Sequence, residues 1–156
     1  MTIYPSLFDR LKSQHLAINE IIKPVGTLRL AVRPQPGKWN IHDNIAHLAK
    51  YQQVFTNRIN DILVNDEMIY ERYQAEDDPE FETWRLLETN DLLKRLSGDR
   101  ALIVKLIMHL SGEELDRVGI HRKFGKLNIP GWTEFFLLHE AHHIYTIFQI
   151  ANEPGE

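Results

Sequence analysis

The amino-acid sequence predicts an all-α protein, a four-helix bundle, and three observations support this fold class. Apolar residues recur about every 3.6 positions in four long stretches, which is the period of an amphipathic helix. The connecting segments are polar or rich in Pro and Gly, and no stretch reads as a convincing strand. Four helices with modest loops are typical of a bundle. Because the chain has 156 residues, we expect residues 1–156 to form a single domain.

The first helix is predicted over about residues 6–23. Its apolar residues keep the helical period, and Pro24 and Gly26 then end it. Residues 33–38, RPQPGK, combine two prolines with a glycine, so we expect a loop there.

The second helix is predicted from Asn40 to about Val64. Asn40 is a favourable N-cap, and Asp43 lies three residues later, near the positive end of the helix dipole. One face of this helix is apolar and should be buried. It carries Ile41, Ile45, Leu48, Tyr51, Phe55, Ile59 and Ile62.

The third helix is predicted to follow an acidic loop at residues 65–79, which has room for a short helical turn. Asp78 followed by Pro79 resembles an N-cap with proline in the first helical position. We expect the helix to continue to about Leu110, with a bend near residues 97–98, Ser-Gly. Ser111 and Glu114 then form a capping box for one further turn.

The fourth helix is predicted from about Pro130 to Ala151, after a last loop at residues 117–130. The basic stretch HRKFGK at residues 121–126 is expected to be a solvated part of that loop. The fourth helix is apolar nearly all round. We therefore expect it to be central in the bundle or shared with a partner subunit.

Composition excludes several classes of function. The chain has no cysteine, so disulfides and Cys-ligated metals are excluded and any metal ligands must be His, Asp or Glu. The net charge is −4 and no basic block is long, so we expect no nucleic-acid partner. No apolar run approaches the roughly 18 residues that span a bilayer, so we expect no membrane insertion. The N-terminal residues do not resemble a signal peptide, which predicts a cytoplasmic protein.

Three histidines are the leading functional candidates. His139 and His143 are four residues apart in the last helix, where two side chains differ by about 40° in direction and about 6 Å in height. His47 lies at the edge of the apolar face of the second helix. His142 points about 100° away from His143, although spacing alone does not exclude a pair of His139 and His142. The sequence has no HExxH motif, so a zincin is not supported.

Other polar residues near these histidines have two interpretations each. Tyr51 lies one turn after His47 and could donate a hydrogen bond to the site, but core packing is the simpler expectation. Arg58 could hold an anionic substrate, although an ion pair with a neighbouring carboxylate is the simpler expectation. Glu140 is expected to be solvated or interfacial, and His42 to be exposed. We expect His15, His109 and His121 to be ordinary histidines, and Trp84 and Trp132 to lie in the core or an interface.

Two stretches resemble the DinB/YfiT-like family. RPQPGKWNIHDNIAHLAKYQQVFTNRI is similar to the second-helix region of that family in the positions of Trp39, His47-Leu48 and Arg58-Ile59. LDRVGIHRKFGKLNIPGWTEFFLLHEAHHIYTIFQI is similar to the last loop and helix, with Gly125 before two histidines four apart. The resemblance covers about residues 5–150.

The resemblance implies a four-helix bundle that binds a divalent ion, either zinc, nickel or iron, through His47, His139 and His143. Tyr51, Arg58 and His142 are then candidates for supporting the ligands or contacting substrate. One departure is Thr146, where members of the family often have Gln, and it affects the surroundings of the metal rather than its ligands.

The resemblance also implies activities. Some members transfer a low-molecular-weight thiol, of the bacillithiol or mycothiol type, to electrophiles, and members frequently form homodimers. We therefore expect a metal-dependent thiol S-transferase acting on a small molecule. A metal-dependent hydrolase is the first alternative, and a non-catalytic ligand-binding bundle with a vestigial metal site is the second.

Overall fold

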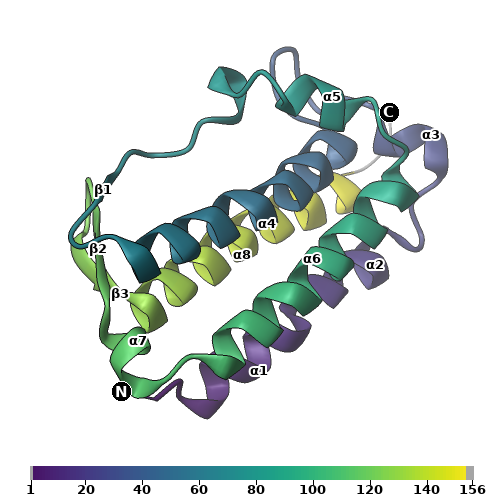
Figure 1. Cartoon of the computed structure of the whole chain (residues 1–156). Coiled ribbons are helices and arrows are strands. Elements are labelled where there is room, and N and C mark those ends of the chain that lie inside the picture. The colour runs from purple at the N-terminus through teal and green to yellow at the C-terminus, as the bar shows by residue number, and fades with distance from the viewer. Residues whose placement is uncertain (1, 154–156) are drawn as a thin grey trace.

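The computed structural model describes residues 2–153 and has four long helical segments that enclose two clusters of buried apolar side chains (Figure 1). The second, third and fourth segments are single helices, and the first consists of two short α-helices joined by a 3-10 turn. The second segment packs against the third and fourth, and the first packs against the same two, which closes the bundle. The segments are α1 (Pro5–Ser13), η1 (Gln14–Leu16) and α2 (Ala17–Ile22), then α4 (Ile41–Val64), α6 (Thr89–His109) and α8 (Ile129–Asn152).

The first segment differs from prediction because it is not one continuous helix. The 3-10 turn η1 separates α1 from α2. This turn brings the side chain of Gln14 against α8, where its amide donates hydrogen bonds to the Leu137 carbonyl at 2.8 Å and to Glu140 at 3.0 Å. A cross-helix contact therefore accompanies the break in the helix.

The prediction for α4 is confirmed. The Asn40 side chain accepts a hydrogen bond from the Asp43 amide at 2.7 Å, and the Asp43 carboxylate accepts one from the Asn40 amide. The helix buries its apolar face and several polar residues, including Asn44, His47 and Gln52. It is therefore the central helix of the bundle.

The helix α8 is less central than predicted. It packs its inner face on α4, α1 and α2. Its outer side leaves Leu138, Tyr145 and Phe148 half exposed or more, so apolar side chains on this helix face solvent in the monomer. A homodimer that uses this surface stays a prediction.

The predicted third helix is divided into α5 (Phe81–Arg85) and α6. Asp78 does not cap a helix that starts at Pro79. Its carboxylate instead accepts a hydrogen bond from the Glu80 amide at 2.9 Å and forms a tight turn. The predicted bend at residues 97–98 is wrong, because Gly98 lies on the exposed side of an uninterrupted α6.

The prediction that the chain has no strand is also wrong. A three-stranded sheet pairs β1 (Ile69–Tyr70) in parallel with β2 (Val118–His121), and β2 antiparallel with β3 (Gly125–Asn128). The strands have only two to four residues each, too few for an alternation of apolar and polar residues to be recognised in the sequence. Gly119 is required in β2, because a Cβ atom there would lie 2.8 Å from the Ile62 side chain. The basic stretch at residues 121–126 therefore begins in β2 and ends in β3, and only residues 122–124 form a turn; its residues after His121 are exposed.

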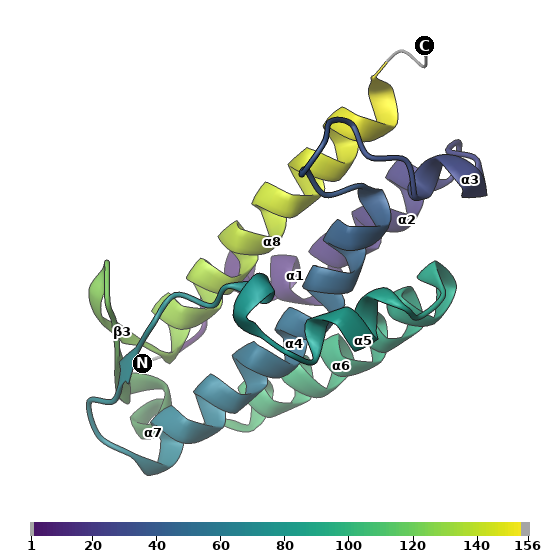
Figure 2. The same ribbon diagram turned by 90° about the horizontal axis from the view of Figure 1, so that it is seen from above.

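The remaining elements are short. The capping box of Ser111 and Glu114 starts a helix as predicted. The sheet lies at one end of the bundle, and α3 lies at the other (Figures 1 and 2). No helix among residues 2–153 is long and apolar enough to cross a membrane. The short helices are α3 (Thr27–Leu30), η2 (Ala75–Asp77) and α7 (Gly112–Asp116).

Candidate metal centre

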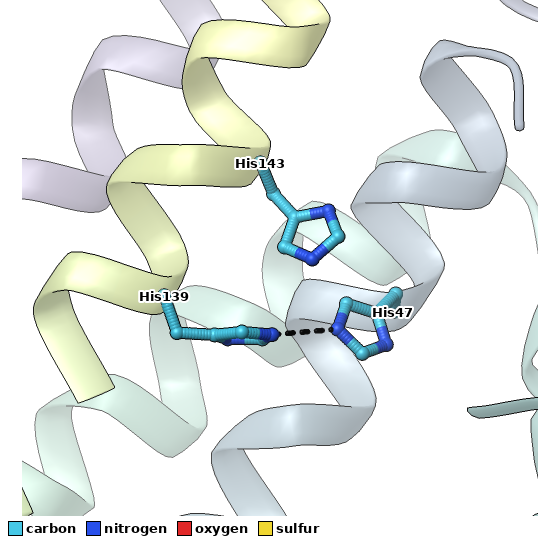
Figure 3. A group of neighbouring side chains, drawn as sticks. All are labelled: His47, His139 and His143. Atoms are coloured by element: carbon cyan, nitrogen blue, oxygen red, sulfur yellow. Dashed lines mark hydrogen bonds between the residues drawn. The ribbon is translucent and has the colours of Figure 1, made fainter. Parts of the chain in front are cut away.

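The structure brings the three predicted histidines together between α4 and α8. His47 projects from α4, and His139 and His143 project from successive turns of α8 (Figure 3). One ring nitrogen of each residue lies within 4.8 Å of the other two. The Nε2 atoms of His47 and His139 are only 3.1 Å apart. We call these three residues the triad.

His142 is separate from the triad, as the helical wheel predicts. Its side chain is exposed, while His47 is buried and His139 and His143 are mostly covered. Its ring still packs edge-on against His143, with centroids 5.3 Å apart. His142 therefore lies at the edge of the site, where it could meet a bound molecule.

A chain of hydrogen bonds fixes the orientation of His143. The Asn44 amide nitrogen donates to the Asn40 carbonyl at 2.8 Å, which turns the Asn44 oxygen toward His143. That oxygen lies 2.8 Å from Nδ1 of His143, so Nδ1 carries the proton. The unprotonated Nε2 is then the nitrogen that points toward His47 and His139 in Figure 3. A supporting hydrogen bond of this kind is typical of metal-binding histidines.

All three imidazoles are neutral at neutral pH. Burial, followed by the charges of the other two histidines, lowers the pKa of His47 to about 2. Burial is also the main cause that lowers the pKa of His139 to about 3 and that of His143 to about 4. Neutral imidazole is the form that binds metal ions, so the site needs no deprotonation to accept one.

The donor set and its spacing fit a divalent ion. Nitrogen ligands about 2.05 Å from a tetrahedral zinc ion are about 3.3 Å apart, close to the separation of the His47 and His139 Nε2 atoms. The Nδ1 atoms of these two residues are buried without a hydrogen-bond partner among residues 2–153. The triad thus combines converging ring nitrogens with incomplete internal hydrogen bonding.

Aromatic side chains from outside the two helices cover the triad. Trp39 lies 5.1 Å from His47 and 5.9 Å from His143 between ring centroids, and Tyr73 stacks on His47 at 5.8 Å. Phe81 meets His47 edge-on at 6.2 Å. Sequence reasoning missed Tyr73 and Phe81, since nothing in the sequence places residues 65–81 over α4.

Residues 71–80, which we call the strap, connect the sheet to α5 above α4 (Figures 1 and 2). The Tyr73 hydroxyl donates to Asp78 at 2.7 Å. Buried Lys50 on α4 pairs with Glu80 and lies 3.8 Å from Asp78. These bonds anchor the strap to α4 and hold Tyr73 against His47.

A cavity of about 420 Å³ opens beside His143. Its walls come from the loop before α4 and from the last turns of α8, and most of its lining side chains are polar. Thr146 is among them, so the departure from the family pattern lies in this cavity rather than among the ligands. The lining also includes Gln35, Lys38, Trp39, Asn44, His142 and Gln149.

Tyr51 is buried, which agrees with the expectation that it packs in the core. The expectation that Arg58 forms an ion pair with a neighbouring carboxylate is wrong. The Tyr51 ring lies 4.1 Å from that of His139, and its hydroxyl accepts a hydrogen bond from Arg58 at 3.2 Å. Arg58 also donates to the Glu71 carbonyl at 2.8 Å. Among residues 2–153 it forms no ion pair, because the carboxylate of Glu71 is directed to Arg122.

The expectation that Glu140 is solvated or interfacial is wrong. Its side chain is buried and forms an ion pair with Arg100, which is buried too. His42 is partly buried rather than exposed, because its ring nitrogens bond to Thr89 and to the Arg85 carbonyl at 2.8 Å each. Both side chains are therefore structural. His15 and His121 are buried, and Trp84 and Trp132 lie in the core.

Comparisons with known proteins agree with this architecture. The sequence model of the DinB superfamily matches residues 11–147. The structure is similar to that of Bacillus subtilis YfiT, described as "a probable metal-dependent hydrolase with an unusual four-helix bundle topology", with a TM-score of 0.78 and 14% identity over 94% of this chain and 84% of that one. It is also similar to the DinB-like protein YjoA of Bacillus subtilis, with a TM-score of 0.63 and 17% identity over 97% of this chain and 94% of that one. No curated protein matches the sequence.

Proposed function

The chain belongs to the DinB superfamily, and from this premise we propose that His47, His139 and His143 bind one catalytic divalent ion, either zinc, nickel or iron. The observation that carries the proposal is the convergence of three neutral ring nitrogens within 4.8 Å in a covered site. Three protein ligands leave a coordination position for a reactant, which is typical of catalytic rather than structural sites. The cavity beside His143 gives a small molecule access to this side of the triad.

We propose that the reaction is the transfer of a low-molecular-weight thiol, of the bacillithiol or mycothiol type, to an electrophile. When bound, a divalent ion supplies Lewis acidity that lowers the pKa of a thiol or of water and so yields a nucleophile at neutral pH. The protein's part is to orient His143 through Asn44 and to exclude water with Trp39 and Tyr73. The polar cavity would bind one of the two substrates.

A thiol is favoured over water because the carboxylates of Glu140 and Asp78, which lie near the triad, are engaged in other bonds. Among residues 2–153, no carboxylate is hydrogen-bonded to a triad imidazole. Glu140, next in sequence to His139, is bound to Arg100, and Asp78 is bound to Tyr73. Hydrolysis usually uses a positioned base to take a proton from water, whereas a thiol on a metal ion loses its proton outright.

Hydrolysis of a small molecule is the second candidate. The observation that favours it is the shared fold with YfiT, which is described as a probable metal-dependent hydrolase. Both reactions require the same ion and the same triad, so the first experiment tests the site and the second separates the reactions.

The first experiment measures the metal content of the purified protein after reconstitution with zinc or nickel. We expect about one ion per chain in the wild type and a loss of at least tenfold in affinity in His143→Ala, because one of the three ligands is gone. His109→Ala is the matched control, since His109 is an exposed histidine on α6. Metal-free wild type, or equal metal content in His143→Ala, would refute the proposed site.

The second experiment offers the metallated protein several thiols together with a bimane electrophile, and in parallel a chromogenic ester. Conjugation above the metal-free control supports thiol transfer. Ester cleavage that depends on His47, with no conjugation for any thiol, would replace the transferase by the hydrolase.

A further inference from the structure

Arg58 is a partly buried cation that forms no ion pair with any of residues 2–153. It lies on α4 about three turns beyond His47. Its guanidinium lies 5.7 Å from the Trp132 ring centroid and 6.0 Å from that of Tyr70, and it donates hydrogen bonds to the Tyr51 hydroxyl and the Glu71 carbonyl. All of these partners are neutral.

The acidic side chains around Arg58 are engaged elsewhere. Asp61 accepts a hydrogen bond from the Tyr70 hydroxyl at 2.7 Å and another from Asn65. The Glu71 carboxylate pairs with Arg122. A guanidinium has five N–H groups, and Arg58 donates only two of them to the residues that the structure describes. Three N–H groups therefore remain for a ligand.

The Tyr51 hydroxyl adds another donor beside Arg58. It accepts a hydrogen bond from Arg58 and donates its own proton to no residue in the described part of the chain. The same tyrosine ring lies 4.1 Å from His139, so this pair of donors adjoins the triad.

We propose that Arg58 and the Tyr51 hydroxyl bind an oxyanion group, a carboxylate or a phosphate, on the substrate that reacts at the triad. This inference rests on the proposed function, because the triad defines where the reacting atom lies. The planar guanidinium matches the two oxygens of such a group, and partial burial strengthens the attraction by reducing its screening by water. Arg58 is then a specificity-determining residue that selects acidic small molecules.

The test is isothermal titration of the purified protein with three probes of similar shape, namely benzoate, phenyl phosphate and neutral benzamide. We expect wild-type protein to bind at least one of the two anions and to bind benzamide at least tenfold more weakly. Arg58→Gln should weaken anion binding at least tenfold, and Arg58→Lys, which keeps the charge but loses the fork, should give an intermediate affinity. The stronger of the two anions identifies the group as carboxylate or phosphate.

Two control variants separate this proposal from the proposed metal site. Arg95→Gln removes an exposed arginine that also lies over a tryptophan, 5.3 Å from the Trp84 ring, and should leave anion binding unchanged. In His143→Ala, the same anions are titrated into a protein that lacks one of the three triad histidines. Anion binding that persists in His143→Ala but is lost in Arg58→Gln supports the proposal, whether or not the wild type binds metal.

Three outcomes would overturn the anion site. One is equal anion affinity in Arg58→Gln and wild type. Another is binding that requires metal and is indifferent to Arg58, which would mean that the anion binds the ion itself and would leave the proposed function standing. The third is the absence of anion binding by the wild type. Thermal unfolding without ligand checks the fold of Arg58→Gln, which loses the hydrogen bonds to Tyr51 and Glu71 but leaves no carboxylate without a partner.

Discussion

Two consecutive residues of α8 belong to two very different polar clusters. His139 points to His47 and the triad, and Glu140 points to Arg100 in the interior of the bundle. Both clusters are covered by protein, and both consist of polar side chains from several helices. They differ in how completely their hydrogen bonds are satisfied within the protein.

The cluster around Arg100, which we call the Arg100 network, is internally satisfied. Arg100 donates to Gln52 and to the Leu11 carbonyl, each at 3.0 Å, and to Glu140. Gln14 donates to the second oxygen of Glu140 at 3.0 Å. These contacts join all four helical segments of the bundle.

The triad is incompletely satisfied. Its one outside partner is Asn44, and the Nδ1 atoms of His47 and His139 have none among residues 2–153. A closed polar network stabilises the arrangement of helices, whereas ring nitrogens that converge and bond at most to one another leave a place for a ligand. Each prediction below tests one side of this difference.

The largest expected change in the free energy of unfolding comes from breaking the Arg100 network. Arg100→Met leaves the Glu140 carboxylate buried without its charged partner, which should lower the free energy of unfolding by about 3–5 kcal/mol. Urea unfolding followed by circular dichroism measures this change.

The double variant Arg100→Met/Glu140→Met is the control for this prediction. Because it removes both charges, it should recover most of the lost stability. A solvent-exposed ion pair contributes at most about 1 kcal/mol to stability. If Arg100→Met lowers the free energy of unfolding by less than this, the Arg100 network is not what holds these helices together.

A smaller change in the free energy of unfolding is expected from metal binding at the triad. A ligand that binds the folded state alone adds about 2.7 kcal/mol at a concentration 100 times its Kd. We expect zinc or nickel to raise the unfolding free energy of the wild type by about this amount and that of His143→Gln by at most about 1.4 kcal/mol, because a tenfold loss of affinity leaves the metal at about ten times its Kd. Thermal unfolding with and without metal provides the measurement. Stabilisation of His143→Gln equal to that of wild type would show that the metal binds elsewhere.

The sequence predicted the features that depend on helical geometry. The structure places the cap at Asn40, the buried face of α4 and the pair His139 and His143 as expected. The buried face and the pair follow from the helical period of about 3.6 residues. The wheel also separated His142 from the triad correctly. These features need no knowledge of how distant segments meet.

The features that were missed depend on distant contacts. Glu140 was interpreted as solvated because nothing near it in sequence announces Arg100, which lies 40 residues away on α6. Tyr73 belongs to an acidic segment without a period, and only the bonds of Lys50 and Asp78 bring it over His47. The short sheet was missed because four-residue strands that contain glycine show little alternation.

The smallest expected effect concerns His15, a buried histidine beside the Arg100 network. Its Nδ1 has no partner among the described residues, and burial, followed by the charge of Arg100, lowers its pKa from 6.5 to about 4. The unfolded chain therefore binds a proton more readily than the folded protein between pH 6.5 and 4. Stability that is complete above pH 6.5 should fall as the pH falls through this window, by at most about 2 kcal/mol at pH 5 from this group.

Replacing His15 isolates this contribution from those of other titrating groups. His15→Leu should flatten the profile of unfolding free energy between pH 6.5 and 4, because leucine has no proton to gain. His109→Leu, at an exposed position on α6, should retain the wild-type slope. Urea unfolding at closely spaced pH values compares the three proteins. If the His15→Leu and wild-type slopes coincide, the folded protein and the unfolded chain bind the His15 proton equally well. The folded protein then accommodates a second buried positive charge beside Arg100.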